Sequence, residues 1–332
     1  MRILVIGGTG FLGGAATRAG LTGGHDVTVM TRSGRNVAPG AAVLIADRMG
    51  DLPDLTGQFD AVIDTCGYAP DMIDRLKLVL GDVHYIFVSS ISVYDDLSLP
   101  EMDETAAASS ATDEDLQFAA DLPMEKRGNS MAYGAAYGRL KRAAEEAVVT
   151  NFGDEAALIR LGLIVGPGDY MDRFPYWVRR CDEDRPLIVP GPENRLVQII
   201  DIADAGAFMV RLAEAEQGGV FNLTGRPMRF LDMLDAICAE TKVDVPITTA
   251  PLSVFTDVGA EPWGHLPLVL PDKPEVAHML NVSIAKAESA GLTFRPLAET
   301  VQDVLAWDRG RRGIALKCGM PVEMEAAVRK AV

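Results

Sequence analysis

Short apolar runs followed by glycine or polar residues recur along the first half of the chain. The first of them, 2–6 (RILVI), is nearly all apolar, as expected of a strand that is buried on both faces of a parallel sheet. In the next segment, 11–21, the apolar side chains recur near helical spacing. The pattern therefore predicts a strand that turns directly into a helix.

The same alternation of strand-like and helix-like segments continues along the chain. Further strands are predicted over 26–30, 42–46, 60–64, 84–88 and 156–161, and helices over 72–80 and 133–149. Strands that alternate with helices indicate a doubly wound α/β domain on a parallel sheet. We place this domain at residues 1–165, with returns at about 196–223.

Proline-rich turns set the remaining segments apart and predict a smaller C-terminal lobe that binds the substrate. This lobe is expected to comprise 166–195 and 224–310, with helices around 230–240, 283–290 and 297–307. Residues 311–332 form a tail to which the pattern assigns no structure.

The segment 95–130 differs from its surroundings in composition, because Asp, Glu, Ala and Ser dominate it. A short helix is predicted at about 113–120. The segment fits a solvated insertion, and it equally fits a loop that covers a substrate near the end of a strand. The sequence leaves both alternatives open.

Glycines lie where the first strand turns into the first helix, in the stretch GGTGFLG. Free amides at a helix N-terminus carry partial positive charge, and glycines let a pyrophosphate approach the backbone. The spacing of Gly7, Gly10 and Gly13 between a strand and a helix predicts a dinucleotide site in a Rossmann-type sheet. We expect these glycines, Phe11 and Leu12 to contact the cofactor.

Two arginines follow the second predicted strand, where a dinucleotide fold meets the adenosine ribose. Arg32 and Arg35 favour NADP over NAD, because guanidinium groups pair with a 2′-phosphate. Two solvated surface charges, and hence NAD as the cofactor, remain the alternative.

The ends of the third and fourth predicted strands carry further cofactor candidates. Asp47 and Arg48 are expected near the adenine, and Thr65 and Cys66 beside the cofactor. Ligands of parallel sheets bind at the carboxyl ends of strands, which is where these residues fall.

Composition excludes several classes of function. The net charge of −16 argues against nucleic-acid or anionic-lipid partners. The four cysteines contain no C-x-x-C pair, and the four histidines show no ligand spacing, so neither a disulfide framework nor a metal is expected. No apolar run approaches the roughly 20 residues of a membrane-spanning helix. These features predict a cytoplasmic protein.

Several stretches, taken in order, resemble the extended short-chain dehydrogenase/reductase superfamily, which includes the NAD-dependent epimerase/dehydratase group and ketone reductases. They are the glycine stretch above, SSISVY (89–94), YGRLK (137–141), IRLGLIVGPGD (159–169) and QIIDIAD (198–204). The resemblance implies a catalytic serine, tyrosine and lysine at Ser90, Tyr137 and Lys141.

These residue types suit hydride transfer, because a proton must reach or leave the substrate oxygen as the hydride moves. The spacing of four puts Tyr137 and Lys141 on one helix face. Bringing a tyrosine pKa from about 10 to near 7 takes roughly 4 kcal/mol, which a lysine cation can supply. Ser90 is expected to hydrogen-bond the same oxygen and to position the substrate.

The chain departs from the nucleotide-sugar members of the superfamily at two positions. Leu163 stands where those members have an asparagine, and Val197 where they have a diphosphate-binding arginine, with Arg195 two residues away as a substitute. We therefore expect NAD(P)-dependent reduction of a ketone or aldehyde on a small, non-nucleotide substrate. A nucleotide-sugar epimerase or dehydratase, and a non-catalytic NAD(P)-sensing or RNA-associated protein, remain alternatives, and a homodimer is left open.

Overall fold

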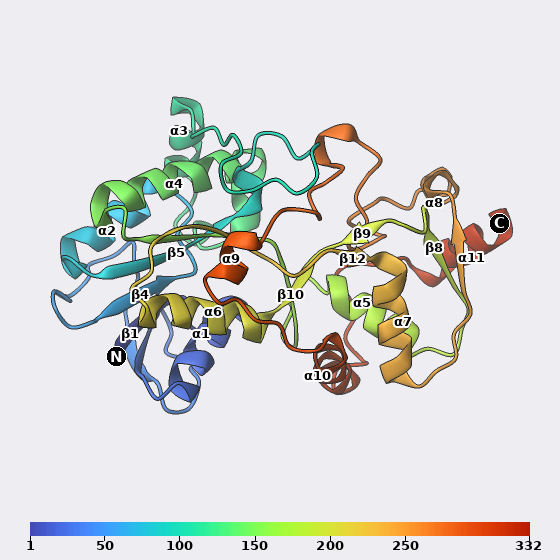
Figure 1. Ribbon diagram of the computed structural model, residues 1–332, viewed down its shortest axis with the longest axis horizontal. Coiled ribbons are helices and arrows are strands. Elements are labelled where there is room, and N and C mark those ends of the chain that lie inside the picture. Colours follow the sequence, from blue (N-terminus) through green and yellow to red (C-terminus); the bar gives the residue numbers. More distant parts are fainter.

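Seven parallel strands form the central sheet of the larger of two lobes, on the left in Figure 1. The computed structural model describes residues 1–332. The sheet order is β11-β6-β5-β4-β1-β2-β3. The strands are β1 (Arg2–Ile6), β2 (Asp26–Thr31), β3 (Ala42–Ile45), β4 (Ala61–Asp64), β5 (His84–Ser90), β6 (Ala157–Leu161) and β11 (Gly219–Leu223).

Side chains of β1 alternate between the two faces of this sheet. Ile3 and Val5 pack on the face covered by α1 (Phe11–Thr22) and α6 (Ile202–Glu214). Leu4 and Ile6 pack on the opposite face, under α2 (Pro70–Leu80) and α4 (Tyr137–Phe152). Burial on both faces explains the nearly unbroken apolar run, and the predicted doubly wound α/β fold is confirmed.

The helix predicted from residue 133 begins four residues later, at Tyr137. Residues Ser130–Ala136 form the 3-10 segment η2, which is interrupted at Gly134 (φ 49°, ψ −131°). This is a backbone conformation that side chains disfavour, so the break falls at the residue that tolerates it.

The helix expected over 283–290 is shorter than predicted and lies in the other lobe. It spans Ala285–Ser289 (α9) and packs on β11, with Ala287 and Ala290 in the core of the larger lobe. The expectation that this helix builds the smaller lobe is wrong. Its small apolar residues suit either core equally, and the sequence pattern does not distinguish the two.

The second lobe surrounds a core of 29 buried hydrophobic residues. At its centre Trp177 is fully buried and donates from Nε1 to the carbonyl of Pro267 at 2.8 Å. The helices are α5 (Arg173–Cys181), α7 (Phe230–Thr241), α8 (Leu252–Asp257) and α10 (Leu297–Arg309). Short strand pairs complete it: β8 (Leu187–Pro190) with β13 (Ile247–Ala250), and β9 (Leu196–Val197) with β12 (Met228–Arg229).

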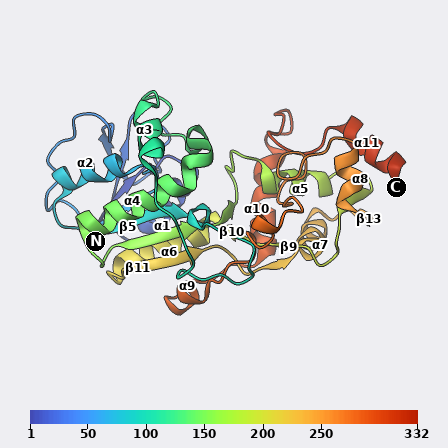
Figure 2. The same ribbon diagram turned by 90° about the horizontal axis from the view of Figure 1, so that it is seen from above.

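Two further strands lie between the lobes, as Figure 2 shows from above for β10. The strands β7 (Leu163–Val165) and β10 (Ile199–Asp201) pair in parallel. Ile199 belongs to the second core, whereas Ile200 belongs to the core of the larger lobe. Alternation along one short strand therefore joins the two cores.

The unassigned tail is part of the second lobe. It contains α11 (Val322–Ala331), whose Val328 is buried in the second core. A buried ion pair between Arg180 and Glu325 (2.8 Å) fixes the helix against α5. The charged flanks of α11 conceal its short apolar face from a pattern-based prediction.

The acidic insertion contains the predicted helix, which is α3 (Asp113–Asp121). Thr112 and Asp115 form a reciprocal capping box at its start. Asp115 also pairs with Arg139 of α4 at 2.7 Å, which ties the insertion to the larger lobe. No helix of the protein has the length and apolar character needed to cross a membrane.

Candidate active site

A cavity of about 630 Å³ opens at the carboxyl edge of the sheet, around the end of β1. The chain proceeds from β1 to β2 and β3 on one side and to β4, β5 and β6 on the other. Ligands of doubly wound sheets bind at such a reversal of strand order. The cavity thus occupies the place where the fold creates a binding crevice.

Nearly all of the residues predicted to bind the cofactor or to act in catalysis meet at this cavity. The exception is Arg35, which is exposed and does not line it. Those that line it are Gly7, Gly10, Phe11, Leu12, Gly13, Arg32, Asp47, Arg48, Thr65, Cys66, Ser90, Tyr137 and Lys141.

The glycine loop leaves no room for larger residues at its core. A Cβ on Gly13 would lie 2.2 Å from the carbonyl oxygen of Gly7, which itself has a positive φ of 81°. Gly10 precedes α1 and has no side chain to cap the first amides of the helix. Those amides have no intrahelical partners, so the loop fits the pyrophosphate of a dinucleotide.

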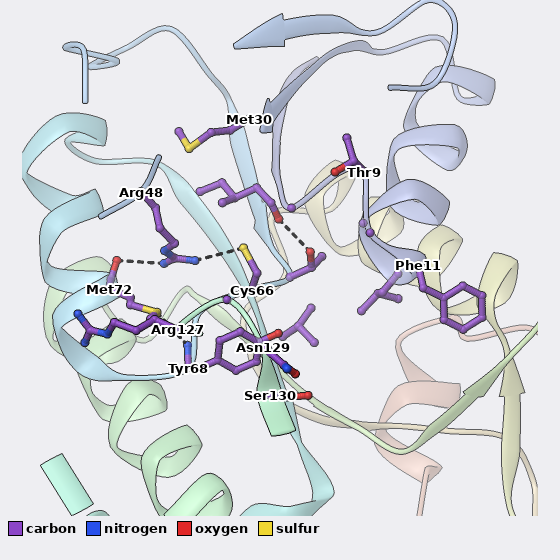
Figure 3. A pocket seen from close by; sticks show the side chains of 18 of the residues that line it. Thr9, Phe11, Met30, Arg48, Cys66, Tyr68, Met72, Arg127, Asn129 and Ser130 are labelled. Atoms are coloured by element: carbon purple, nitrogen blue, oxygen red, sulfur yellow. Dashed lines mark hydrogen bonds between the residues drawn. The ribbon is translucent and has the colours of Figure 1, made fainter. Parts of the chain in front are cut away.

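Arg48 has a different environment from the one expected of an adenine contact. Its side chain is buried, and Nη1 and Nη2 bond the two carboxylate oxygens of Asp64 at 2.7 and 2.9 Å. Nη2 also donates to the carbonyl of Met72 at 3.0 Å, and Nη1 lies 3.6 Å from the Cys66 sulfur (Figure 3). The guanidinium is therefore a fixed part of the cavity wall.

Asp64, which the sequence analysis missed, anchors this wall at the end of β4. It accepts from the Tyr85 hydroxyl at 2.7 Å and from the Cys66 amide at 3.0 Å. Burial alone would raise its pKa, but the Arg48 charge and these hydrogen bonds outweigh burial and hold the pKa below its usual value. An acidic residue ending an otherwise apolar strand was the available signal.

Ser90 and Tyr137 are brought together by a close helix-to-strand contact. Ser90 ends β5, and its hydroxyl accepts from the Ser92 amide at 3.1 Å. A Cβ on Gly138 would lie 2.0 Å from the Ser92 carbonyl oxygen, so only glycine lets α4 begin here. Burial raises the pKa of Tyr137 to about 12, although hydrogen bonding with Ser90 opposes the increase.

Lys141 lies one helical turn below Tyr137 and is fully buried. Its Nζ donates to the carbonyls of Gly67, at 2.6 Å, and Val88. Burial lowers the pKa of Lys141 to about 8. The expected depression of the Tyr137 pKa by Lys141 is absent, because burial dominates and keeps the phenol protonated at pH 7.

The acidic insertion and the second lobe also line the cavity, so the alternative in which the insertion is a loop over the substrate site fits its position. The end of the acidic insertion contributes one wall with Met124, Arg127, Gly128, Asn129 and Ser130, of which Arg127, Asn129 and Ser130 are labelled in Figure 3. Arg127 is held there by an ion pair with Asp71 at 2.6 Å. The second lobe contributes Tyr170 and Arg173. Arg127, Asn129, Ser130 and Arg173 were not predicted as site residues, because no periodic pattern marks them.

The positions that depart from nucleotide-sugar enzymes do not line the cavity. Val197 is fully buried in the second core, and the half-buried Leu163 packs against that core. Arg195 donates to the carbonyls of Gly191 (2.6 Å) and Leu270 (3.3 Å) and so is committed to backbone groups. None of the three contributes a polar group to the site.

No group of three or more His, Cys, Asp or Glu side chains is arranged to hold a metal ion. The cavity instead combines the glycine loop with a serine, a tyrosine and a lysine. Residues 3–224 match the model of the NAD dependent epimerase/dehydratase family, and the chain belongs to this family. Membership confirms the predicted resemblance and supports an NAD-dependent function of the kind found in the short-chain dehydrogenase/reductase superfamily, which includes epimerases.

Solved structures share the fold at low sequence identity. UDP-glucuronic acid 4-epimerase from Bacillus cereus, in complex with NAD, is similar with a TM-score of 0.62 and 16% identity, covering 94% of this chain and 99% of that one. UDP-N-acetylglucosamine 4-epimerase from Methanobrevibacter ruminantium M1 has a TM-score of 0.64 and 14% identity, covering 93% and 98%. These similarities establish the Rossmann-type architecture.

Among curated proteins, the chloroplast stem-loop binding protein of 41 kDa b from Arabidopsis thaliana is 24% identical over 263 residues. The aligned region covers 72% of this chain and 62% of that relative.

Proposed function

We propose that the protein is an NAD(P)-dependent oxidoreductase that reversibly reduces a ketone or aldehyde carbon of a small substrate. The observation that carries the proposal is the meeting of Ser90, Tyr137 and Lys141 with the glycine loop in one cavity. Each residue type alone is common, but their convergence supplies a cofactor cradle and a proton donor together.

A bound nicotinamide ring would supply or accept the hydride. Tyr137 delivers a proton to the substrate oxygen, for which its high pKa keeps it protonated at neutral pH. Ser90 donates a hydrogen bond to the same oxygen and orients it. Lys141 uses two of its three donors on backbone carbonyls, and the third remains for a ligand in the cavity.

We further propose that NADP is preferred over NAD. Arg32 follows β2 at the edge of the cavity and has no hydrogen-bond or ion-pair partner within the chain. A 2′-phosphate would give this guanidinium a charge-assisted partner.

The stoichiometry of cofactor consumption tests the proposed reaction. With NADPH and a panel of ketones and aldehydes, one equivalent of cofactor should be oxidised for each equivalent of product. Tyr137→Phe removes only the hydroxyl and should lower turnover by about 100-fold or more while cofactor binding is retained. Cofactor binding is measured by fluorescence titration, and folding by circular dichroism.

An epimerase or dehydratase returns the hydride within one cycle and consumes no cofactor. The family name and the sugar-nucleotide epimerases among the similar structures support this second candidate. Conversion of UDP-glucuronic acid with catalytic cofactor, together with inactivity toward every carbonyl tested, would establish it and contradict the reductase proposal.

The stem-loop binding relative raises a non-catalytic role as a third candidate. The net charge of −16 is unfavourable for contacts with phosphate backbones. Because the serine, tyrosine and lysine are all present in the cavity, we favour an enzyme over an RNA-associated protein.

A further inference from the structure

Two of the four arginines that line the cavity have no partner in the chain. Arg48 and Arg127 are paired with Asp64 and Asp71. Arg32 and Arg173 make neither an ion pair nor a side-chain hydrogen bond. Arg32 belongs to the larger lobe at the predicted adenosine end of the cavity, whereas Arg173 is the first residue of α5 in the second lobe.

Arg173 is more buried than the other arginines that have no hydrogen-bond or ion-pair partner. The chain contains four arginines whose side chains have no acceptor, and three of them, Arg18, Arg32 and Arg35, are exposed. Arg173 is half-buried, with its guanidinium over the ring of Trp263 at 4.8 Å. A sheltered cation without a counterion is unfavourable unless a ligand supplies the missing charge.

The acidic neighbours of Arg173 form no ion pair with it. Asp169 lies nearby but forms no ion pair with it, and its carboxylate accepts from the Met171 amide at 2.8 Å. Asp172 is engaged by Arg311 and by the Lys317 amide. Arg173 therefore lines the cavity with its guanidinium donors unpaired.

Arg173 shares its cavity with the predicted reaction centre. Tyr170, Arg173 and Tyr137 all line this one cavity. Arg195, the substitute anion ligand expected from the sequence, is bound to backbone carbonyls instead. Arg173 is the cation that remains on the second-lobe side of the cavity.

We propose that Arg173 binds an anionic group of the substrate, a carboxylate or a phosphate, and thereby orients the carbonyl toward Tyr137. The proposal rests on the proposed function, because it names the substrate class of that site. It also changes the expectation derived from Leu163 and Val197. An anion site is present in the second lobe, but at the start of α5.

Binding of simple anions to the protein saturated with NADP⁺ tests this assignment without requiring turnover. Isothermal titration with malonate and with pyrophosphate separates the carboxylate and phosphate alternatives, and bound cofactor blocks its own pyrophosphate site. At least one of the two anions should bind. Arg173→Gln should weaken that anion by about 10-fold or more, as expected for the loss of charge-assisted hydrogen bonds.

Arg18→Gln is the matched control, because it removes the same charge from an exposed arginine outside the cavity. It should leave anion affinity unchanged. Failure of both anions to bind the unaltered protein, or equal affinity in Arg173→Gln, would overturn the proposal.

Chemical labelling provides a second measurement if Arg173→Gln does not fold. Phenylglyoxal modifies accessible arginines, and bound malonate or pyrophosphate should protect Arg173 but not Arg18 in the unaltered protein. Equal labelling of Arg173 with and without each anion would contradict the site.

The anion site and the proposed reaction can fail separately. If anion binding depends on Arg173 but no carbonyl compound is reduced, the reaction is wrong and the anion site stands. If carbonyls are reduced with equal kcat/KM for an acid and its neutral ester, and Arg173→Gln changes neither value, the reaction stands and the anion site is wrong.

Discussion

The two lobes differ in how their cores relate to the order of the chain. In the larger lobe, β1 to β6 with their helices come from one continuous stretch, and only α6, β11 and α9 return to it. The second core combines distant stretches that include Trp177, Phe230, Val301 and Val328. The first lobe is thus specified by local patterns, and the second by contacts between remote segments.

The two lobes also contribute different kinds of residues to the cavity. The cofactor cradle and the proposed catalytic residues all belong to the larger lobe, whereas Tyr170 and Arg173 come from the second. In the proposed enzyme, the regular lobe determines the reaction and the irregular lobe selects the substrate. Substitutions in the two lobes should therefore have separable effects.

Each lobe contains a buried carboxylate held by arginine. In the larger lobe Asp64 pairs with Arg48 at 2.7 Å in the cavity wall. In the second lobe Asp308 pairs with Arg179 at 2.6 Å and accepts from Arg311, away from the cavity. Both carboxylates are fully buried, so the two pairs form a matched comparison.

The largest expected effect is loss of stability on breaking these pairs. Asp64→Asn and Asp308→Asn should each lower the free energy of unfolding, by up to about 3–5 kcal/mol for Asp64, because Arg48 is left buried without its counterion and the partly buried Arg179 loses its own. Urea unfolding measures this loss. Only Asp64→Asn should also weaken cofactor binding, since its pair lines the cavity.

Cofactor affinity, measured in the folded fraction of each variant, separates the lobes. If Asp308→Asn weakened cofactor binding as much as Asp64→Asn, the second lobe would contribute to the cofactor site, and the separation of roles between the lobes would be wrong.

Patterns in the sequence predicted most of the larger lobe because its strands are buried on both faces and therefore read as apolar runs. Every predicted strand of its sheet is present, and the glycine loop and Ser90, Tyr137 and Lys141 converge as expected. The start of α4 was misplaced, because the apolar spacing continues through η2 and only the conformation of Gly134 ends it.

The second lobe was less predictable for physical reasons. Two-residue strands such as Leu196–Val197 carry no periodicity, and α11 becomes a core element only through contact with α5 and its neighbours. The sequence likewise cannot show that Arg195 binds backbone carbonyls while Arg173 has no partner. Such pairing is a property of the folded chain.

Lys141, in the larger lobe, is the one buried lysine of the protein. Its loss of a proton on folding should make the free energy of unfolding depend on pH, whereas an exposed lysine of the second lobe should not. Burial lowers its pKa from 10.5 to about 8 in the folded state. Between about pH 8 and 10.5 the unfolded chain therefore binds more protons than the folded one. The contribution of this group to the free energy of unfolding rises across that window by about 3 kcal/mol.

Urea unfolding of the cofactor-free protein from pH 7 to 10.5 measures this contribution as the difference from Lys141→Met. Lys330→Met, which removes an exposed lysine from the second lobe, should retain the rise. Parallel curves for the unaltered protein and Lys141→Met would show that the lysine does not lose its proton on folding in this range.

The smallest expected effect concerns the cofactor end of the larger lobe, where two arginines were equivalent in the sequence. Arg32 lines the cavity and Arg35 does not. Arg32→Ala should weaken NADP by about 10-fold, or 1.4 kcal/mol, and leave NAD unchanged, because only NADP carries the phosphate that the guanidinium would bind. Arg35→Ala should weaken NADP binding less.

The measurement is the dissociation constant of each variant for both cofactors. Equal affinity of the unaltered protein for NADP and NAD would contradict the proposed preference for NADP. A larger effect of Arg35→Ala than of Arg32→Ala would assign the phosphate contact to Arg35. Neither substitution should alter the affinity for malonate or pyrophosphate, since that affinity is attributed to Arg173 in the other lobe.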